Sequence, residues 1–486
     1  MRAAGKSDYR DAGGREDLLR SISIWLFVVT LLALLVNFVA RGGNLASGPA
    51  PPTPLGPVLS AQQQSRELCG EAPKNGRSVL LTLAYGPEIK TFIEAASERF
   101  EQRCPHIEVR HQVMDEISAA AAIASGAGPS TIWIAGNELA LSLATRPMDS
   151  GLAQAAPILF SSPYVFVAWE DRAQLLQRLL RSPVSGEGAW MQLSCPLLPR
   201  AAGEGGTTEP TTTAVSWVDW YRASILPPAR PPARRAKWRA EPVPPPSEET
   251  SGALAETQAW GPVKFRHAAP VRAALGLGAL SLVAYDYLRP PQARAQGPAT
   301  AADLSRALQD QAPALQVWLR RCRGALGALP ETEAGLVREF EEQGAARSDV
   351  IAVREHAALS LLSKRAAHGA AVRGLRILYP ATSLRGEYRA VLTARPGPGQ
   401  QAVAEIAHKW IAFLLRDDMQ RLAIEQGLRP TTGVGTIRDH DVPANPFLSL
   451  RHRGVELSPS QEPPPALDAA AARRLMRIWE DAVLSN

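Results

Sequence analysis

Apolar residues follow three patterns along this chain: one long unbroken run, short runs of strand length, and runs with helical spacing. The long run, ISIWLFVVTLLALLVNFVA at 22–40, contains no charged residue. As a helix it measures roughly 28 Å, which matches the hydrocarbon core of a bilayer. A secretory signal peptide has a shorter apolar region and a small-residue cleavage site, and RGGNLASG offers a poor one. The run is therefore predicted as an uncleaved transmembrane helix, with a cleaved signal as the alternative.

Basic residues are concentrated on one side of this run. Residues 1–21 contain five of them, whereas Arg41 stands alone between the run and Arg66. The positive-inside rule then keeps 1–21 in the cytoplasm and sends the rest of the chain across. We expect a single-pass protein of the cytoplasmic membrane, N-terminus inside, with its main domain extracytoplasmic. Residues 41–77, rich in Pro and Gly at first, are expected to be a linker.

Strand-length and helical patterns alternate from residue 78 onward. VLLTLAYG is an apolar run closed by glycine, and PEIKTFIEAASERFEQRC has apolar residues on one helical face. IEVRHQV reads as a strand, 116–127 as a helix and STIWIAG as a strand. A further strand at 157–170 precedes the helical DRAQLLQRLLRS. This βαβαβ order predicts an α/β domain built on mostly parallel sheets.

The pattern breaks at about 200–260, where Pro, Arg and Glu dominate and no periodicity remains. This insertion is expected to be disordered or polyproline-like. Its basic cluster is predicted to be a solvated loop rather than a contact with anionic lipid or a partner; the cluster comprises Arg230, Arg234, Arg235, Lys237 and Arg239. Helices are expected again at 273–287, 302–326, 332–343, 402–426 and 468–484, with strands at DVIAVREH and GLRILYPA.

Charge and cysteine content narrow the function classes. The net charge of +6 arises from scattered arginines, without an aromatic-interleaved basic patch, so no nucleic-acid partner is expected. The four cysteines form no C-x-x-C pair, which excludes a zinc ribbon or thioredoxin-like motif. Cys69 and Cys104 flank the first strand and helix, and we favour a disulfide between them. Four buried free thiols are the equal alternative.

Several segments, in order, resemble bacterial extracytoplasmic solute-binding proteins related to molybdate binders, in the branch often fused to a von Willebrand factor type A domain, which is not found within these residues. The segments are LTLAYGPEIKTFIEAASERFEQRCPHIEV, PSTIWIAGN, FSSPYVFVAWED, VKFRHAAP, DVIAVREH, LRILYPATSL and HKWIAFLLRDDMQRLAIEQGLRP. The resemblance implies two α/β lobes with a small-molecule or anionic ligand between them, and an ABC-type permease or another membrane protein as partner. It places the lobes at 78–168 with 376–486, and at 169–375.

Ligand candidates follow from strand ends, where parallel sheets place their sites. They are Tyr85, Gly86, Thr131, Trp133, Ser161 and Ser162. In the resembling family, a polar turn follows a proline that corresponds to Pro270. Here Ala273, Ala274 and Leu275 take the positions of that turn. Its other polar positions correspond to Thr332, Arg354 and Glu355. Arg272 and Arg354 are candidates to face an anion, with ordinary surface arginines as the alternative reading.

Motifs of catalysis are not found in the sequence. It contains no H-E-x-x-H, G-x-S-x-G, phosphate-binding loop or calcium-binding loop. RDHDV at 438–442 clusters His and Asp, but adjacent residues rarely converge on one metal ion. We therefore expect no enzyme, no cofactor and no metal. The leading hypothesis is a solute-binding protein serving a membrane transporter, and the alternative is a degenerate solute-binding fold that acts as a scaffold or sensor.

Overall fold

The computed structural model describes residues 67–70, 78–128, 130–144, 156–181, 188–195, 216–225, 248–289, 297, 299–326, 328–367, 374–393, 401–431 and 436–485. The apolar run 22–40 lies outside these residues, as do 1–21 and most of the linker. Across the described ranges, no helix has both the length and the apolar character needed to cross a membrane. The expected localisation as a single-pass membrane protein is corrected to what the described residues show: they supply no membrane-spanning helix, and the run that carries the expectation lies outside them.

The first lobe is built on a six-stranded sheet. In sheet order its strands are β10 (Arg429–Pro430), β4 (Ile158–Ser161), β9 (Glu387–Leu392), β3 (Ile132–Ala135), β1 (Val79–Tyr85) and β2 (Ile107–Val113). Strand β1 pairs in parallel with β2 and β3, whereas β9 is inserted antiparallel between β3 and β4.

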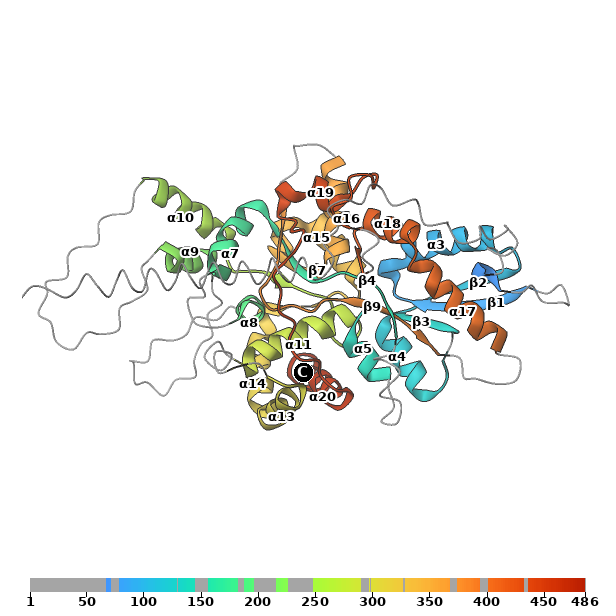
Figure 1. Cartoon of the computed structure of the whole chain (residues 1–486). Coiled ribbons are helices and arrows are strands. Elements are labelled where there is room, and N and C mark those ends of the chain that lie inside the picture. The colour runs from blue at the N-terminus through green and yellow to red at the C-terminus, as the bar shows by residue number, and fades with distance from the viewer. Residues whose placement is uncertain are drawn as a thin grey trace, which may run out of the picture. The chain divides into compact units, whose positions relative to one another are not determined.

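Helices cover both faces of this sheet (Figure 1). α3 (Lys90–Arg103), α17 (Gln401–Leu414) and α18 (Asp417–Glu425) pack on one face, and α4 (Glu116–Ser125) and α5 (Glu138–Ala144) on the other. The alternation of strand side chains explains this arrangement. Leu81 and Leu83 pack with the first group of helices, and Trp133 and Ala135 pack with the second.

The second lobe is built on a four-stranded sheet in the order β6 (Phe265–Arg266), β7 (Val350–Arg354), β5 (Tyr164–Trp169) and β8 (Leu375–Leu378). β6 and β7 are parallel, and β5 is antiparallel to both of its neighbours. Its helices include α7 (Glu170–Arg181), α8 (Ala189–Ser194), α15 (Glu333–Arg347), α16 (Glu355–Ala367) and α19 (Pro446–Ser449). The expectation of mostly parallel sheets is corrected: both sheets are mixed, because each contains a reversed strand next to a crossing between the lobes.

Two adjacent stretches of the described chain connect strands of one sheet to strands of the other. The chain leaves the first sheet after β4 through Ser162 and Pro163, and it returns between β8 and β9. The two crossings are hydrogen-bonded to each other, since Ser162 N donates to Gly386 O at 3.0 Å and Tyr164 N donates to Leu384 O at 3.1 Å. Gly386 has φ +57°, and a Cβ there would lie 2.1 Å from Ser162 O. Only glycine fits this approach without strain.

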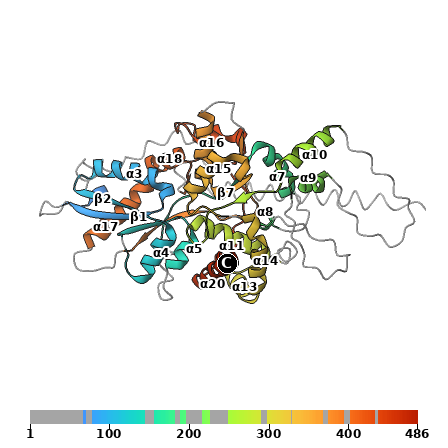
Figure 2. The same ribbon diagram turned by 180° about the vertical axis from the view of Figure 1, so that it is seen from behind.

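A further group of helices, at the bottom in Figure 2, shares one apolar cluster with α4, α5 and the adjoining face of the first sheet. It contains α11 (Ala274–Leu288), α13 (Ala301–Asp310), α14 (Ala312–Leu326), α20 (Ala469–Trp479) and a terminal π-helical turn at Glu480–Leu484. α20 packs against α5 of the first lobe as well as against α11 and α14. Arg473 Nη2 also donates to Leu143 O in α5 at 3.2 Å.

Two helices lie inside the range expected to lack regular structure: α9 (Trp217–Ile225) and α10 (Glu248–Trp260). Aromatic packing accounts for them, since the rings of Trp220 and Trp260 lie edge-on to Trp217. Trp217 Nε1 also donates to the buried Asp349 at 2.9 Å. These local contacts outweigh the poor helical pattern of the surrounding sequence.

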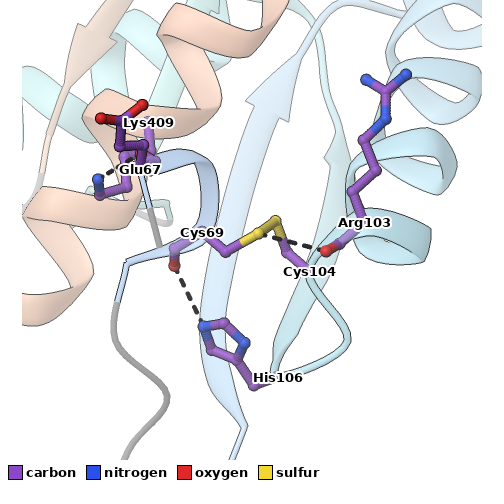
Figure 3. The surroundings of a disulfide bond; sticks show 6 residues. All are labelled: Glu67, Cys69, Arg103, Cys104, His106 and Lys409. Atoms are coloured by element: carbon purple, nitrogen blue, oxygen red, sulfur yellow. Dashed lines mark hydrogen bonds between the residues drawn. A yellow bond between two sulfur atoms is a disulfide. The ribbon is translucent and has the colours of Figure 1, made fainter. Parts of the chain in front are cut away.

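All four cysteines form disulfides. Cys69 pairs with Cys104, the pair favoured from the sequence, and Cys195 pairs with Cys322. The first bond ties residues 67–70 to the end of α3 (Figure 3). His106 Nε2 lies 3.2 Å from Cys69 O, and Lys409 Nζ donates to Glu67 O at 2.7 Å. The second bond joins α8 to α14 within the second lobe.

Candidate functional site

The two lobes meet around a small cavity of about 50 Å³. The first lobe contributes the 3-10 turn after β1 (η1, Pro87–Ile89) and the start of α4. The second lobe contributes the starts of α11 and α15 and the last residue of β7. Strand ends and helix starts therefore converge on this cavity, which is the arrangement that places ligand sites in α/β proteins.

The guanidinium of Arg354 lies at the centre of this region. Its side chain, at the end of β7, is 2% exposed. Nη1 lies 2.5 Å from Glu88 Oε1 and Nη2 lies 3.0 Å from Glu116 Oε1, both in the first lobe. Nη1 also donates to the hydroxyl of Tyr388 at 3.1 Å. A residue of the second lobe thus inserts a cation among acidic groups of the first.

The carboxylates are positioned by the first turns of helices. Glu116 begins α4, and Asp115 caps this helix by accepting from Ser118 N. Glu116 Oε1 accepts from Gly136 N at 3.1 Å. Glu333 begins α15, where Thr332 caps the helix by accepting from Gly335 N. Acidic side chains favour such positions because the helix dipole is positive there.

Glu88 is held in place by its neighbouring turn. It lies in η1 two residues after Gly86, and a Cβ on Gly86 would lie 2.2 Å from the Glu88 carboxylate. The glycine therefore lets this carboxylate fold back toward Arg354.

Burial of three carboxylates beside one guanidinium sets their protonation. Burial raises the pKa of Glu116 to about 8 and that of Glu333 to about 7, with Arg354 opposing both shifts. Burial also acts on Glu88, but Arg354 and a hydrogen bond from Glu116 outweigh it, so the pKa of Glu88 is lowered. At neutral pH the arrangement is an ionised Glu88, a protonated Glu116 and a Glu333 close to its midpoint.

Glu333 has unused hydrogen-bonding capacity. Its Oε1 accepts from Arg354 N at 2.6 Å, whereas its buried Oε2 has no hydrogen-bond partner. The closest guanidinium nitrogen, Arg354 Nη1, lies 3.7 Å from this oxygen, which is too far for a hydrogen bond. Buried polar atoms are normally paired, so an unpaired carboxylate oxygen at a cavity indicates room for a donor.

Three residues singled out from the sequence line this cavity: Arg272, Thr332 and Arg354. Arg272 is exposed, whereas Arg354 is buried. Glu355, next in the chain, faces elsewhere: it forms an ion pair with Arg429 at 2.5 Å and accepts from the hydroxyl of Tyr379.

The remaining candidates lie in structural positions. Tyr85 is fully buried, with its hydroxyl 3.0 Å from His111 Nδ1. The hydroxyl of Thr131 accepts from Thr82 N. Thr131 precedes β3, so it lies at the end of this strand away from Gly136 and the cavity. Trp133 packs in the cluster under α4 and α5. Ser161 ends β4, and Ser162 Oγ accepts from His356 N at 2.9 Å at the crossing.

Sequence reasoning missed Glu88, Glu116, Glu333 and Tyr388. The three glutamates each stand in the first turn of a helix or 3-10 turn, directly after a strand or a loop. That repeated position is the feature that a search of strand-to-helix junctions for acids would have found.

Comparisons with known proteins give a limited result. No protein-family model and no curated protein matches the chain. Among solved structures it is similar to iron-bound HitA from Pseudomonas aeruginosa, at 13% identity and a TM-score of 0.44, over 83% of this chain and 99% of that one. It is also similar to maltose-bound MalE3 from T. maritima, at 13% identity and a TM-score of 0.43, over 82% and 98%.

A third similar structure is the sulfate-binding protein SubI from Mycobacterium tuberculosis, at 13% identity and a TM-score of 0.39, over 81% of this chain and 96% of that one. Scores of this size do not carry an argument about fold or ligand. The assignment of a two-lobed α/β fold therefore rests on the two mixed sheets, the crossings between them and the cavity where they meet.

Proposed function

We propose that this chain is a non-catalytic binding protein that encloses a small solute between its lobes and presents it to a membrane transporter of the ABC type. The observation that carries the proposal is the convergence of buried polar groups from both lobes on one cavity. Glu88 and Glu116 come from the first lobe, and Glu333 and Arg354 from the second. A ligand held by both sets favours the closed arrangement of the lobes over an open one, which is how such proteins couple binding to shape.

A thermal-melt screen of the full-length chain tests this function. The panel contains oxyanions, sugars, amino acids and amines. A ligand at a hundred times its dissociation constant stabilises the folded state by about 2.7 kcal/mol. The shift should depend on concentration and be weakened in Glu116→Gln. Glu339→Gln is the matched control, because Glu339 pairs with Arg266 at 2.6 Å outside the cavity.

One observation favours a second function, a scaffold or sensor without a ligand. Arg354 already provides the carboxylates with a cation, and the remaining space of about 50 Å³ is small for a solute. A protein that melts cooperatively but shows no shift with any member of the panel would support this alternative and contradict solute binding.

A further inference from the structure

We infer that the solute is a small organic cation, whose ammonium or guanidinium group binds the carboxylates that now surround Arg354. This inference rests on the proposed function and adds the class of ligand. Under this inference, the Arg354 side chain is a tethered occupant: its guanidinium holds the position between the carboxylates that the ligand's cationic group would take. A free cation displaces it or binds beside it.

The charge of the cavity lining supports a cation. Its carboxylates come from both lobes and are Glu88, Asp115, Glu116, Glu331 and Glu333. Arg272 and Arg354 are the basic side chains of this lining. Arg272 is exposed to solvent, so within the buried part a single guanidinium faces three carboxylates. Of the three carboxyl groups, Glu88 is ionised and Glu333 lies near its midpoint, so the negative charge already matches or exceeds that of the one guanidinium and would repel an anion.

Helix N-termini favour anions, but here their effect is offset. α4 and α15 both begin with a buried glutamate, which takes the position that a bound anion would take. The third helix, α11, begins at Ala274 after Ala273 and has no side-chain cap. The side chains at this helix start offer no hydroxyl donor to an oxyanion and suit the alkyl stem of an amine, whereas its uncapped backbone N–H groups are a feature that favours an anion.

The geometry also identifies where the ligand's donor would bind. Glu333 lines the cavity, and its Oε2 is buried and has no hydrogen-bond partner. An ammonium or guanidinium N–H that reaches this oxygen would form a charge-assisted hydrogen bond. The Arg354 guanidinium shows that a planar cation fits between Glu88 and Glu116. Within the described ranges, no cluster of His, Cys, Asp and Glu has the arrangement of a metal site, which favours an organic cation over a metal ion.

Isothermal titration calorimetry on the full-length chain tests the inference. The probes are agmatine, putrescine and arginine as cations, sulfate and molybdate as anions, maltose as a neutral solute, and Ca²⁺. We expect at least one organic cation to bind. Glu333→Gln, which keeps the shape of the side chain, should weaken that binding about tenfold or more, the effect of one charge-assisted hydrogen bond. Glu339→Gln on the same helix should bind as the wild type does.

A second variant tests the role of Arg354. Arg354→Met removes the tethered occupant and should bind the same cation more tightly than the wild type. If this variant does not fold alone, recovery of its folding by millimolar agmatine, but not by sodium sulfate, gives the same answer.

The outcomes separate the two proposals. Binding of an anion, maltose or Ca²⁺ that Glu333→Gln alters, without binding of any organic cation, would overturn the ligand class and leave solute binding intact. Cation binding that is equal in Glu333→Gln and Glu339→Gln would overturn the site. No binding by any probe, in the wild type or in Arg354→Met, would refute both proposals.

Discussion

Replacing Arg354 by methionine would remove the buried cation while keeping a side chain of similar length. The guanidinium is 2% exposed and reaches Glu88 at 2.5 Å and Glu116 at 3.0 Å. Breaking a buried ion pair by removing one partner costs about 3–5 kcal/mol, because the other charge is left buried and unpaired. We expect the folded state of Arg354→Met to be destabilised accordingly.

Protonation of the neighbouring carboxyl groups brings this cost to the low end of the range. With a pKa of about 8, Glu116 is protonated at pH 7, so Glu88 is the carboxylate that loses an ionic partner. The cost at pH 7 should therefore be about 3 kcal/mol, since Glu88 is the one carboxylate of the three that is fully ionised. It should fall at pH 5, where Glu88 can take up a proton once Arg354 no longer lowers its pKa.

Urea denaturation followed by circular dichroism measures the effect, with the slope of the transition checked for change. The matched control is Arg110→Met, because Arg110 pairs with Glu108 at 3.1 Å but is 64% exposed. Exposed pairs contribute about 0–1 kcal/mol. A cost for Arg354→Met that equals the cost for Arg110→Met, with unchanged slopes, would refute the account of the site as a buried charge cluster.

Three further predictions concern pH, the disulfides and the crossing. The folded-state pKa values of Glu116 and Glu333, about 8 and about 7, lie above the ordinary 4.5. Their contribution to the stability of the folded state is therefore complete below pH 4.5 and is lost as the pH rises to 8. The melting temperature should fall between pH 6 and 8.5, and it should fall less in Glu116→Gln. Replacing both cysteines of the Cys69–Cys104 bond, which spans 35 residues, should lower the free energy of unfolding by about 4 kcal/mol. Replacing those of the Cys195–Cys322 bond, which spans 127 residues, should lower it by about 5 kcal/mol. Urea titration measures both, and equal stability with and without either bond would contradict this. Gly386→Ala should lower the melting temperature because of its positive φ and the contact with Ser162 O, whereas Gly252→Ala, with open space around it, should not.

The sequence is sufficient for the α/β class because that class depends on local patterns, whereas the expectation of two lobes follows from the resemblance of ordered segments. The run at 79–85 is apolar and closed by Gly86, the run at 107–113 alternates, and the two form neighbouring parallel strands. The direction of β9 and β5 is not encoded in this way. Whether a strand runs with or against its neighbour depends on where the chain crosses between lobes, which no local period reveals. The division of the chain at 168 and 375 stays a prediction.

The site is less accessible to sequence reasoning because burial of a charge is a property of the assembled lobes. Arg354 is a candidate because it corresponds to a polar position of the resembling family, but nothing local distinguishes it from the exposed Arg272. Glu116 and Glu333 look like ordinary first-turn acids, which are usually solvated. Their burial follows from partners more than 200 and about 20 residues away along the chain, respectively.

The packing of α20 against both lobes constrains how they can separate. Opening about the two crossings would move α5 relative to α11 and α14, and α20 contacts all three. The helix begins with a run of alanines, and α5 carries small side chains between its buried leucines. Packed helices move past each other by small shear displacements. Ligand entry would then involve a sliding of α20 over α5 and the exchange of the Arg473 hydrogen bond, in addition to rotation at the crossings.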